Sequence, residues 1–253
     1  MRIAVSNENF GGSAERLLGD GAARPILVLI RFRVRGAVRF VSHAEMLKVF
    51  QRACARAGIK VQHSQGFNPH PKLSLPLPRP VGVESDDELL CLRIDNSTGA
   101  QQHKNTSDLC ISIKTRLSEQ LPEGCELLSV EVAQTACTPQ PRCVTYVLAV
   151  RPEYADNRLK ATIKHLSERK QIIVERTIYA EKLKIQNRKS RIKEVDVRPF
   201  LESIEVDDRG VVVKCIISSA GSIRVEEILK LLEIEVDGLV SPVRRTNVQW
   251  KSN

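Results

Sequence analysis

The sequence predicts an α+β fold in which antiparallel sheets carry helices on one face. Apolar and polar residues alternate in 26–35 with the period of two that is typical of a strand, whereas apolar residues in 43–57 recur at helical spacings of three and four. The predicted element order from 26 to 133 is strand, helix, strand, strand, helix, strand, and a similar order follows from 144 to 250. We therefore expect two ferredoxin-like (βαββαβ) units in tandem.

The predicted domain boundaries follow from this pattern. The two units are expected at 26–134 and 143–253. The segment 135–142 (TACTPQPR) is interpreted as a linker, because it holds two prolines and no hydrophobic periodicity. Residues 1–25 contain four glycines among polar residues and no long apolar core, which favours a flexible leader over a signal peptide.

The expected elements can be placed by residue number. In the first unit the strands are 26–35, 72–77, 88–94 and 125–133, and the helices are 43–57 and 107–119. In the second unit the strands are 144–150, 172–179, 195–206, 211–217 and 243–250, and the helices are 153–169 and 223–233. Such a sheet leaves the face without helices open, and RNA-recognition folds of this type use that face.

The first expected strand carries a row of arginines. Arg31, Arg33 and Arg35 alternate with apolar residues, so one face of the strand is cationic and the other enters the core. Three like charges along one strand repel each other unless the face is well solvated or meets an anion. The pattern therefore predicts either a solvated surface or an anion-binding surface.

The first helix is marked at both ends. Ser42 precedes Glu45 by three residues, which is the spacing of a capping box, so the helix is expected to begin at His43, and Gly58 can adopt the left-handed conformation that ends it. The expected buried stripe is Leu47, Phe50, Cys54 and Ala57. A second face carries the basic residues Lys48, Arg52 and Arg56, which form either a solvated surface or part of a nucleic-acid-binding surface.

A stiff loop follows this helix. Prolines at 69, 71, 76, 78 and 80 exclude a helix and favour an extended path toward an edge strand. Because the prolines restrain the backbone, the entropy cost of holding a ligand is lowered. We expect either a binding loop or a structural turn with a surface histidine. The loop residues are Gly66, Phe67, Asn68, Pro69, His70, Pro71 and Lys72, of which His70 and Lys72 offer hydrogen-bond donors.

The charge balance points to an acidic partner. The formal net charge is +9 and the isoelectric point is about 9.3, which favours nucleic acid first and an acidic protein second. Aromatic residues make up only 4% of the chain, so recognition of the RNA backbone or shape is favoured over base stacking. One run, 182–193, has six basic residues in twelve and no acidic one; these expected RNA contacts are Lys182, Lys184, Arg188, Lys189, Arg191 and Lys193.

The cysteines do not suggest a metal site. There are seven, and no two form a Cys-x-x-Cys pair, which predicts reduced and mostly buried thiols. Because neither the Fe–S nor the zinc spacing occurs, we expect no metal and no cofactor. No apolar run approaches the roughly 20 residues that span a bilayer, so we expect a soluble, cytoplasmic protein without a membrane partner.

Three stretches together resemble a known family. They are RFVSHAEMLKVFQRACARAG (39–58), S-x-GFNPHPKLS (64–74) and VGVESDDELL (81–90), with weaker similarity in 193–206, 221–232 and 243–246. This pattern resembles the uncharacterised bacterial proteins known as radical SAM-linked or radical SAM-associated, except that Ala44-Glu45 replaces the usual Leu-Asp. The resemblance implies a partner enzyme of the radical SAM/cobalamin type.

Catalytic signatures are weak. The sequence has no Gly-rich phosphate loop, no nucleophile elbow and no zinc-binding helix motif. The acid/base candidates are His43, Glu45, His70 and Asp196, and each has a structural alternative, such as a turn cap for Asp196.

Three functions are compatible with these observations. We expect a non-catalytic accessory protein that binds structured RNA, ribosomal or transfer RNA, and presents it to the enzyme that the resemblance implies. The first alternative is a metal-independent endoribonuclease of the tandem ferredoxin-like type, similar to the CRISPR repeat-processing nucleases, with a histidine as general acid or base. The second alternative is a protein-interaction subunit with an acidic partner.

Overall fold

The structure, a computed structural model, describes residues 25–95, 105–179 and 190–251. The expected leader 1–25 lies outside the described residues except for Pro25, and so do the basic residues of 182–189. The expected α+β class is confirmed, with four α-helices and mostly antiparallel strands in the described part of the chain. Every helix of that part is too short or too polar to cross a membrane.

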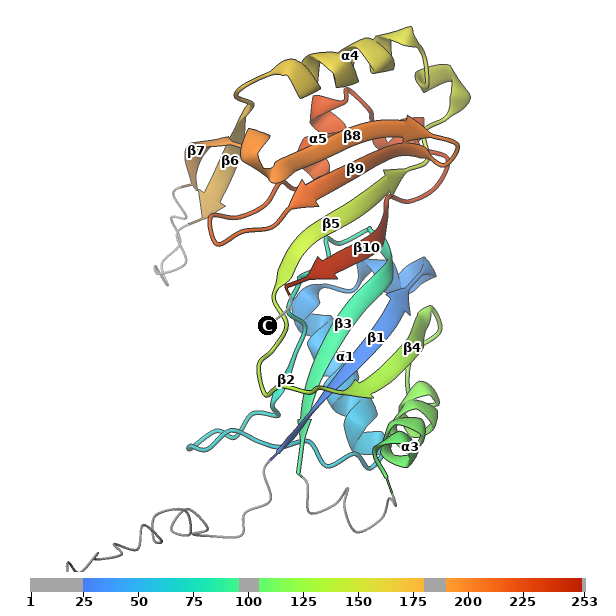
Figure 1. Ribbon diagram of the computed structural model, residues 1–253, viewed down its shortest axis with the longest axis vertical. Helices are drawn as coiled ribbons and strands as arrows, with labels where there is room; N and C mark the ends of the chain where they lie inside the picture. The colour runs from blue at the N-terminus through green and yellow to red at the C-terminus, as the bar shows by residue number, and fades with distance from the viewer. Residues whose placement is uncertain (1–24, 96–104, 180–189, 252–253) are drawn as a thin grey trace, which may run out of the picture.

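The first half of the chain builds four strands and two helices (Figure 1). The strands are β1 (Ile26–Val34), β2 (Leu73–Ser74), β3 (Glu84–Ile94) and β4 (Cys125–Val132), and the helices are α1 (His43–Arg56) and α3 (Thr106–Ser118). Hydrogen bonding gives the antiparallel order β4-β1-β3-β2. Alternate residues of β1 pack against the helices, and the Phe32 and Phe50 rings meet edge to face with centroids 4.8 Å apart.

The predicted ends of α1 are confirmed. The Ser42 hydroxyl accepts a hydrogen bond from the Glu45 amide at 3.3 Å, and the Glu45 carboxylate accepts one from the Ser42 amide at 2.9 Å, which completes the capping box. Gly58 adopts a φ of +63° directly after the helix. The buried stripe differs in part, because Met46 and Ala53 are buried while Leu47 is only partly so. The buried face is therefore turned slightly from the expected one.

The second half repeats this order with an insertion. Its elements are β5 (Pro141–Leu148), α4 (Asn157–Glu168), β6 (Ile173–Tyr179), β7 (Ser190–Asp196), β8 (Leu201–Asp207), β9 (Gly210–Ile216), α5 (Val225–Leu231) and β10 (Arg244–Trp250). The sequence predicted five strands in this half. Four of them correspond to β5, β6, β9 and β10, and the fifth was a single strand 195–206. That last expectation is wrong, because the 3₁₀ turn Arg198–Phe200, which contains Pro199, separates β7 from β8. The main strands then follow the order β10-β5-β9-β8, and β6 pairs only with β7.

The two halves share one eight-stranded sheet. β10 of the second half pairs in parallel with β3 of the first, through Arg244 opposite Glu84 and Arg245 opposite Ser85. The strands then diverge, and the Asp87 carboxylate accepts a hydrogen bond from the Val248 amide at 2.8 Å. The expected linker region runs from β4 to β5 in front of β1 and β3 in Figure 1, where the Arg93 guanidinium of β3 donates to the Ala136 carbonyl at 2.6 Å, and β5 already begins at Pro141. Helices of both halves pack on one face, which Figure 1 shows with α1 and α5 behind the strands.

Candidate functional site

The arginine row (Arg31, Arg33 and Arg35) lies on the sheet face away from the helices, as expected, but it is not a free cationic surface. Each guanidinium meets a carboxylate of a neighbouring strand. The pairs are Arg31–Asp87 at 2.5 Å, Arg33–Glu126 at 3.0 Å and Arg35–Glu84 at 3.1 Å, and Asp86 contacts both Arg33 and Arg35. The anion that the row requires is therefore supplied by β3 and β4 of the same chain, so its charge is largely balanced.

The stiff loop is closed by hydrogen bonds at its base, and we call residues 62–72 the Phe67 loop. The Ser64 amide donates to the His70 carbonyl at 2.8 Å, and the His70 amide donates to the Ser64 hydroxyl at 2.9 Å. The base is joined to the end of β3, since the Gln62 amide donates to the Arg93 carbonyl and the Arg93 amide to the Lys72 carbonyl. The loop thus has a fixed backbone, and its tip residues from Gln65 to His70 are exposed.

Strands β6 and β7 form a hairpin that projects from the second half, here called the β6–β7 hairpin. Arg176 anchors it to α5 by donating to the Glu227 carboxylate at 2.7 and 2.9 Å and to the Ser222 carbonyl at 2.7 Å. Burial raises the pKa of the Glu227 carboxyl, but the hydrogen bonds from Arg176 and Arg224 outweigh it and hold the pKa below its usual value. The pair is therefore ionised at neutral pH.

Asp196 closes the base of the same hairpin. Its carboxylate accepts hydrogen bonds from the Ile172 amide at 2.9 Å and from the Arg198 amide at 3.0 Å. This is the turn-capping role that the sequence offered as an alternative to catalysis. Of the expected RNA contacts at the hairpin, Lys193 is exposed on β7, whereas 182–189 and the side chain of Arg191 lie outside the described residues.

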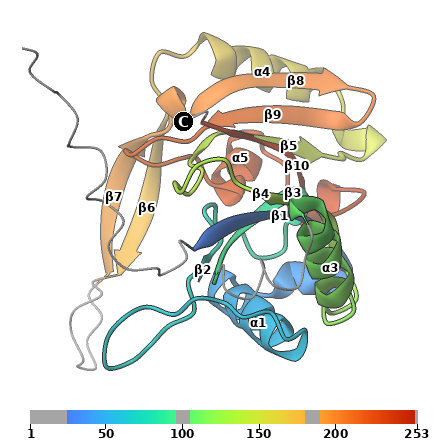
Figure 2. The same cartoon turned by 60° about the horizontal axis from the view of Figure 1, so that its bottom comes forward.

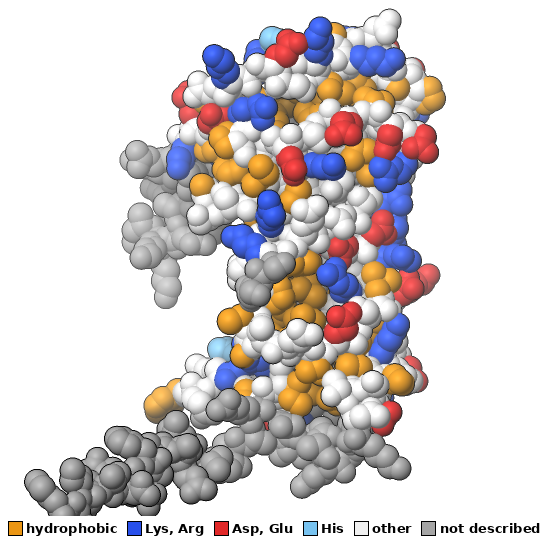
Figure 3. Space-filling model, viewed as in Figure 1, with side chains coloured by type: hydrophobic (Ala, Val, Ile, Leu, Met, Phe, Trp, Pro, Cys, Tyr) orange, Lys and Arg blue, Asp and Glu red, His pale blue; other side chains and the backbone are white. Residues whose placement is uncertain are grey.

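The Phe67 loop and the β6–β7 hairpin project on the same side of the molecule, as Figures 1 and 2 both show. Figure 3 shows the surface hollowed between them. No aspartate or glutamate occurs in 46–83, which holds the Phe67 loop, or in 182–193, whereas the described strands of the β6–β7 hairpin carry Glu175, Glu194 and Asp196. The longer of these acid-free segments holds six lysines and arginines as well as His63 and His70. The Phe67 loop therefore has basic residues without acidic neighbours in sequence, whereas on the described part of the hairpin exposed Glu194 is next to Lys193.

The three basic residues on one face of α1 differ in their hydrogen bonding. Lys48, Arg52 and Arg56 are all exposed. However, Arg56 donates to the Gln120 side chain at 3.0 Å and to the Gln120 carbonyl at 2.6 Å, which ties the end of α1 to the end of α3. Lys48 and Arg52 make no hydrogen bond among the described residues, so they alone of this row keep all their donors for a partner.

The catalytic candidates are not assembled into one site. Glu45 is used in the capping box, and the Ser42 hydrogen bonds lower the pKa of its carboxyl. Asp196 caps the hairpin base, and His70 lies on the exposed loop tip. Among the hydrogen bonds of the described residues, none joins two of these groups or His43. An acid/base pair is therefore not formed by the residues that the sequence nominated.

The cysteines are placed as expected, because five of the seven are buried. Burial raises the pKa of Cys54 and Cys91 to about 11 and that of Cys125 to about 12, so these thiols stay protonated at neutral pH. In the part of the chain that the structure describes, no group of three or more His, Cys, Asp or Glu side chains is arranged to hold a metal ion.

A buried ion pair lies where the halves meet, and sequence reasoning missed it. Arg245 of β10 is 1% exposed and donates to the Glu88 carboxylate of β3 at 2.9 Å, to the Pro78 carbonyl at 2.9 Å and to the Tyr146 hydroxyl at 3.4 Å. Nearby, the Arg79 guanidinium donates to several main-chain carbonyls of 38–41 and 80–83. Arg245 lies in VRRT (243–246) and Glu88 in SDDE (85–88), and only the fold brings these two motifs together.

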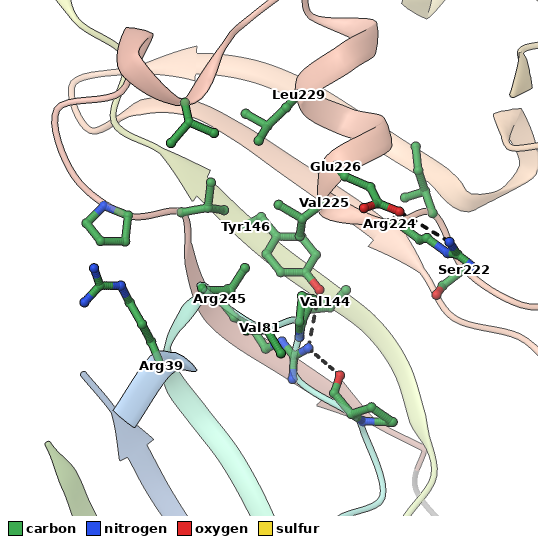
Figure 4. Close-up of a pocket in the computed structure, with 18 of the residues that line it drawn as sticks. Arg39, Val81, Val144, Tyr146, Ser222, Arg224, Val225, Glu226, Leu229 and Arg245 are labelled. Carbon is green, nitrogen blue, oxygen red and sulfur yellow. Dashed lines mark hydrogen bonds and ion pairs between the residues drawn. The ribbon is translucent and has the colours of Figure 1, made fainter. Parts of the chain in front are cut away.

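An apolar groove of about 650 Å³, the junction groove, opens beside this pair (Figure 4). Val144 and Tyr146 form part of its lining, Val225 and Leu229 of α5 form another part, and Val81 comes from the first half. Val81, Phe40 and Val236 are large apolar side chains that remain more than half exposed at the groove. Arg39 stacks on Phe40, with its guanidinium carbon 4.2 Å from the ring centroid, and Arg224 lies near α5. The groove is thus apolar with cationic residues at its edge.

The comparisons with known proteins concern the family alone. No curated protein matches this chain. A family model described as an uncharacterized protein conserved in bacteria (DUF2344) matches residues 28–231, from β1 to the end of α5. This confirms the expectation of an uncharacterised bacterial family, and the description names no radical SAM enzyme. Because the match covers most of the chain, the protein belongs to this family of uncharacterized proteins conserved in bacteria.

Proposed function

We propose that this chain is a non-catalytic accessory protein of the cytoplasm that binds structured RNA, such as ribosomal or transfer RNA. The observation that carries the proposal is the position of the Phe67 loop and the β6–β7 hairpin on one side of the molecule, flanking a hollow. The Phe67 loop belongs to the acid-free segment 46–83, and the second acid-free run, 182–193, includes the first residues of β7. A phosphate backbone in the hollow meets lysine and arginine without competing carboxylates from these segments, and counterion release favours its binding.

The RNA contacts proposed here differ from those on the sheet face. The arginine row already has carboxylate partners. An RNA phosphate that bound there would have to lose its hydration and displace these carboxylates. Lys60 and Lys193 are exposed and have no carboxylate within ion-pair distance among the described residues. We therefore assign the main RNA contacts to the projections and to Lys48 and Arg52 of α1.

The fold supports this assignment by analogy. We propose that each half is a ferredoxin-like unit, because the orders β4-β1-β3-β2 and β10-β5-β9-β8 place corresponding strands in corresponding positions. The β6–β7 hairpin is then an insertion between the first helix and the second strand of the second unit. Insertions at loops of a rigid scaffold are where binding residues concentrate.

The partner in this proposal is a radical SAM/cobalamin enzyme, which the family resemblance suggests. We assign its docking site to the junction groove, because exposed Phe40, Val81 and Val236 there form the kind of apolar patch that marks protein interfaces. Among the hydrogen bonds of the described residues, the Arg39 guanidinium donates to the Gly36 carbonyl alone. Charge complementarity therefore favours an apolar segment of the enzyme that carries an acidic residue opposite Arg39.

The experiment is ultraviolet crosslinking in cells, followed by purification of the full chain and sequencing of the retained RNA. Specific structured RNA is expected, and its affinity should fall with salt by a log-log slope of about 0.7 to 0.9 per phosphate contact. The Val236→Glu variant places a charge in the junction groove and should lose the radical SAM enzyme while keeping the RNA. Absence of RNA at low salt would sink the RNA part, and an acidic protein retained without RNA would support the interaction subunit instead.

The nuclease alternative receives less support from the geometry. A metal-independent ribonuclease needs a positioned general acid or base. His70 is exposed on the loop tip and none of the other candidates is hydrogen-bonded to it among the described residues. Metal-independent cleavage of the retained RNA by the purified chain would reverse this preference.

A further inference from the structure

We propose that Phe67 stacks on an unpaired nucleobase, so that the RNA bound by this protein carries a loop, a bulge or a single-stranded end beside its helical part. This inference rests on the proposed function and narrows its substrate class. The observation that motivates it is the exposure of Phe67, whose relative accessibility of 107% is the highest among the large hydrophobic residues that the structure describes as exposed. No residue that the structure describes covers this ring.

The exposure is a fixed property of the loop. Hydrogen bonds between Ser64 and His70 close the loop at one level, and the Lys72 amide donates to the Gln62 carbonyl at 2.6 Å at the next. Pro69 and Pro71 each remove a backbone torsion from the descending strand. The ring is therefore presented on a backbone that loses little entropy when a ligand binds, although leaving an aromatic side chain in water is unfavourable for the free protein.

The chemistry around the ring favours a nucleobase over an apolar pocket of a protein. The loop contains no acidic residue, and His63, His70 and Lys72 are its cationic or titratable groups, with Lys60 two residues before its start. Next to the ring, Gln65 and Asn68 are exposed and offer amide donors and acceptors of the kind that read the edges of unpaired bases. A partner that combines negative charge, polar edges and flat π-surfaces is an RNA with unstacked bases.

The low aromatic content of the chain agrees with this assignment. A stacking platform needs several aromatic side chains along a strand of RNA, whereas a single ring can hold one extruded base while basic residues contact the backbone. The helical part of the RNA is expected on the hollowed surface beside the loop (Figure 3). One base is thus recognised by stacking and the remainder by charge and shape.

The test is fluorescence anisotropy with two labelled probes, an RNA stem with an unpaired loop and a blunt duplex of the same stem. Wild-type protein should bind the loop probe more tightly. Phe67→Ala should weaken binding to the loop probe about 5- to 150-fold, the equivalent of one lost base stack, and leave the duplex affinity unchanged. Phe67→Trp should retain binding and show quenched tryptophan fluorescence with the loop probe, whereas Phe67→Leu, which keeps apolar volume without a π-surface, should behave like Phe67→Ala.

The matched control is Ile111→Ala, which removes another exposed apolar side chain, on α3. It should bind both probes like wild type, and all variants should unfold at the wild-type temperature because neither side chain is buried. Equal loss on both probes, or full binding by Phe67→Leu, overturns the stacking role. Failure of the wild type to bind either probe overturns the proposed function itself, which separates the two claims.

Discussion

The arginine row and the Phe67 loop are both basic in sequence, yet their surroundings in the folded chain differ. Every arginine of the row reaches a carboxylate of β3 or β4 at 3.1 Å or less. The Phe67 loop belongs to a segment of 38 residues, 46–83, in which no carboxylate occurs. The row contributes to the sheet, and the loop presents its side chains to solvent.

The difference teaches that a cationic pattern along one strand does not define a cationic surface. Three of the carboxylates that balance the row come from ESDDE (84–88), about 50 residues later in the chain, and the fourth is Glu126, 93 residues after Arg33; sheet pairing brings all four alongside. Among the hydrogen bonds of the described residues, the loop is joined to the rest of the chain at Arg93 near the end of β3, and no carboxylate of those residues forms an ion pair with it. The charge that a surface presents can therefore be judged only when the ion-pair partners of its residues are known.

The largest effect expected from this comparison concerns an arginine whose carboxylate partner is fully buried. Glu88→Ala should destabilise the protein by about 3–5 kcal/mol, because Arg245 is left buried without its counter-charge. Glu126→Ala, which removes the exposed partner of Arg33, is the matched control and should cost no more than about 1 kcal/mol. Urea unfolding measures both. Similar losses in the two variants would show that burial does not distinguish these pairs.

A smaller but more direct test removes basic residues from the run 182–189 in one variant and from the arginine row in another. The hairpin variant changes Lys182, Lys184, Arg188 and Lys189 to Ser and should flatten the salt dependence of RNA binding by about 0.7 to 0.9 per lost contact. The row variant changes Arg31, Arg33 and Arg35 to Ser and should leave that slope unchanged, while it lowers the unfolding temperature because four carboxylates, those of Glu84, Asp86, Asp87 and Glu126, lose these arginines. If the row variant flattened the slope by two to three contacts, the open sheet face would replace the projections as the RNA site.

The smallest effect is expected for His70→Ala. The His70 backbone, not its side chain, makes the hydrogen bonds that close the loop, so the free energy of unfolding should stay within about 0.5 kcal/mol of wild type. RNA affinity should fall modestly, and neither protein should cleave RNA. Cleavage by the wild type that drops about 100- to 10,000-fold in the variant would instead support the nuclease. A clearly lower melting temperature would make the loop histidine structural.

Local features of the fold were predictable from the sequence. The capping box of Ser42 and Glu45, the stop at Gly58 and the alternation in β1 each depend on residues within four positions of one another, and the structure contains all three. The capping alternative for Asp196 was also visible, because a carboxylate just before the Arg198–Phe200 turn is well placed to accept amide hydrogen bonds.

The features that failed depend on distant residues. The expected strand 195–206 is divided at the Arg198–Phe200 turn, and the separate pairing of β7 with β6 and of β8 with β9 shows the break. The junction groove and the Arg245–Glu88 pair arise from segments far apart in the chain. Neither periodicity nor spacing within one segment carries that information.

The parallel contact of β10 with β3 also has a consequence for how the chain matures. Arg245 and Glu88 are 157 residues apart, so at 5 to 20 residues per second a ribosome needs about 8 to 30 s to make the partner of Glu88 after Glu88 itself. During that interval the edge of β3 at Glu84 and Ser85 lacks its neighbour. During synthesis the first half therefore has an incomplete edge on β3, and Glu88 lacks its arginine partner. In this period a chaperone could bind the exposed edge, or another strand could pair with it prematurely.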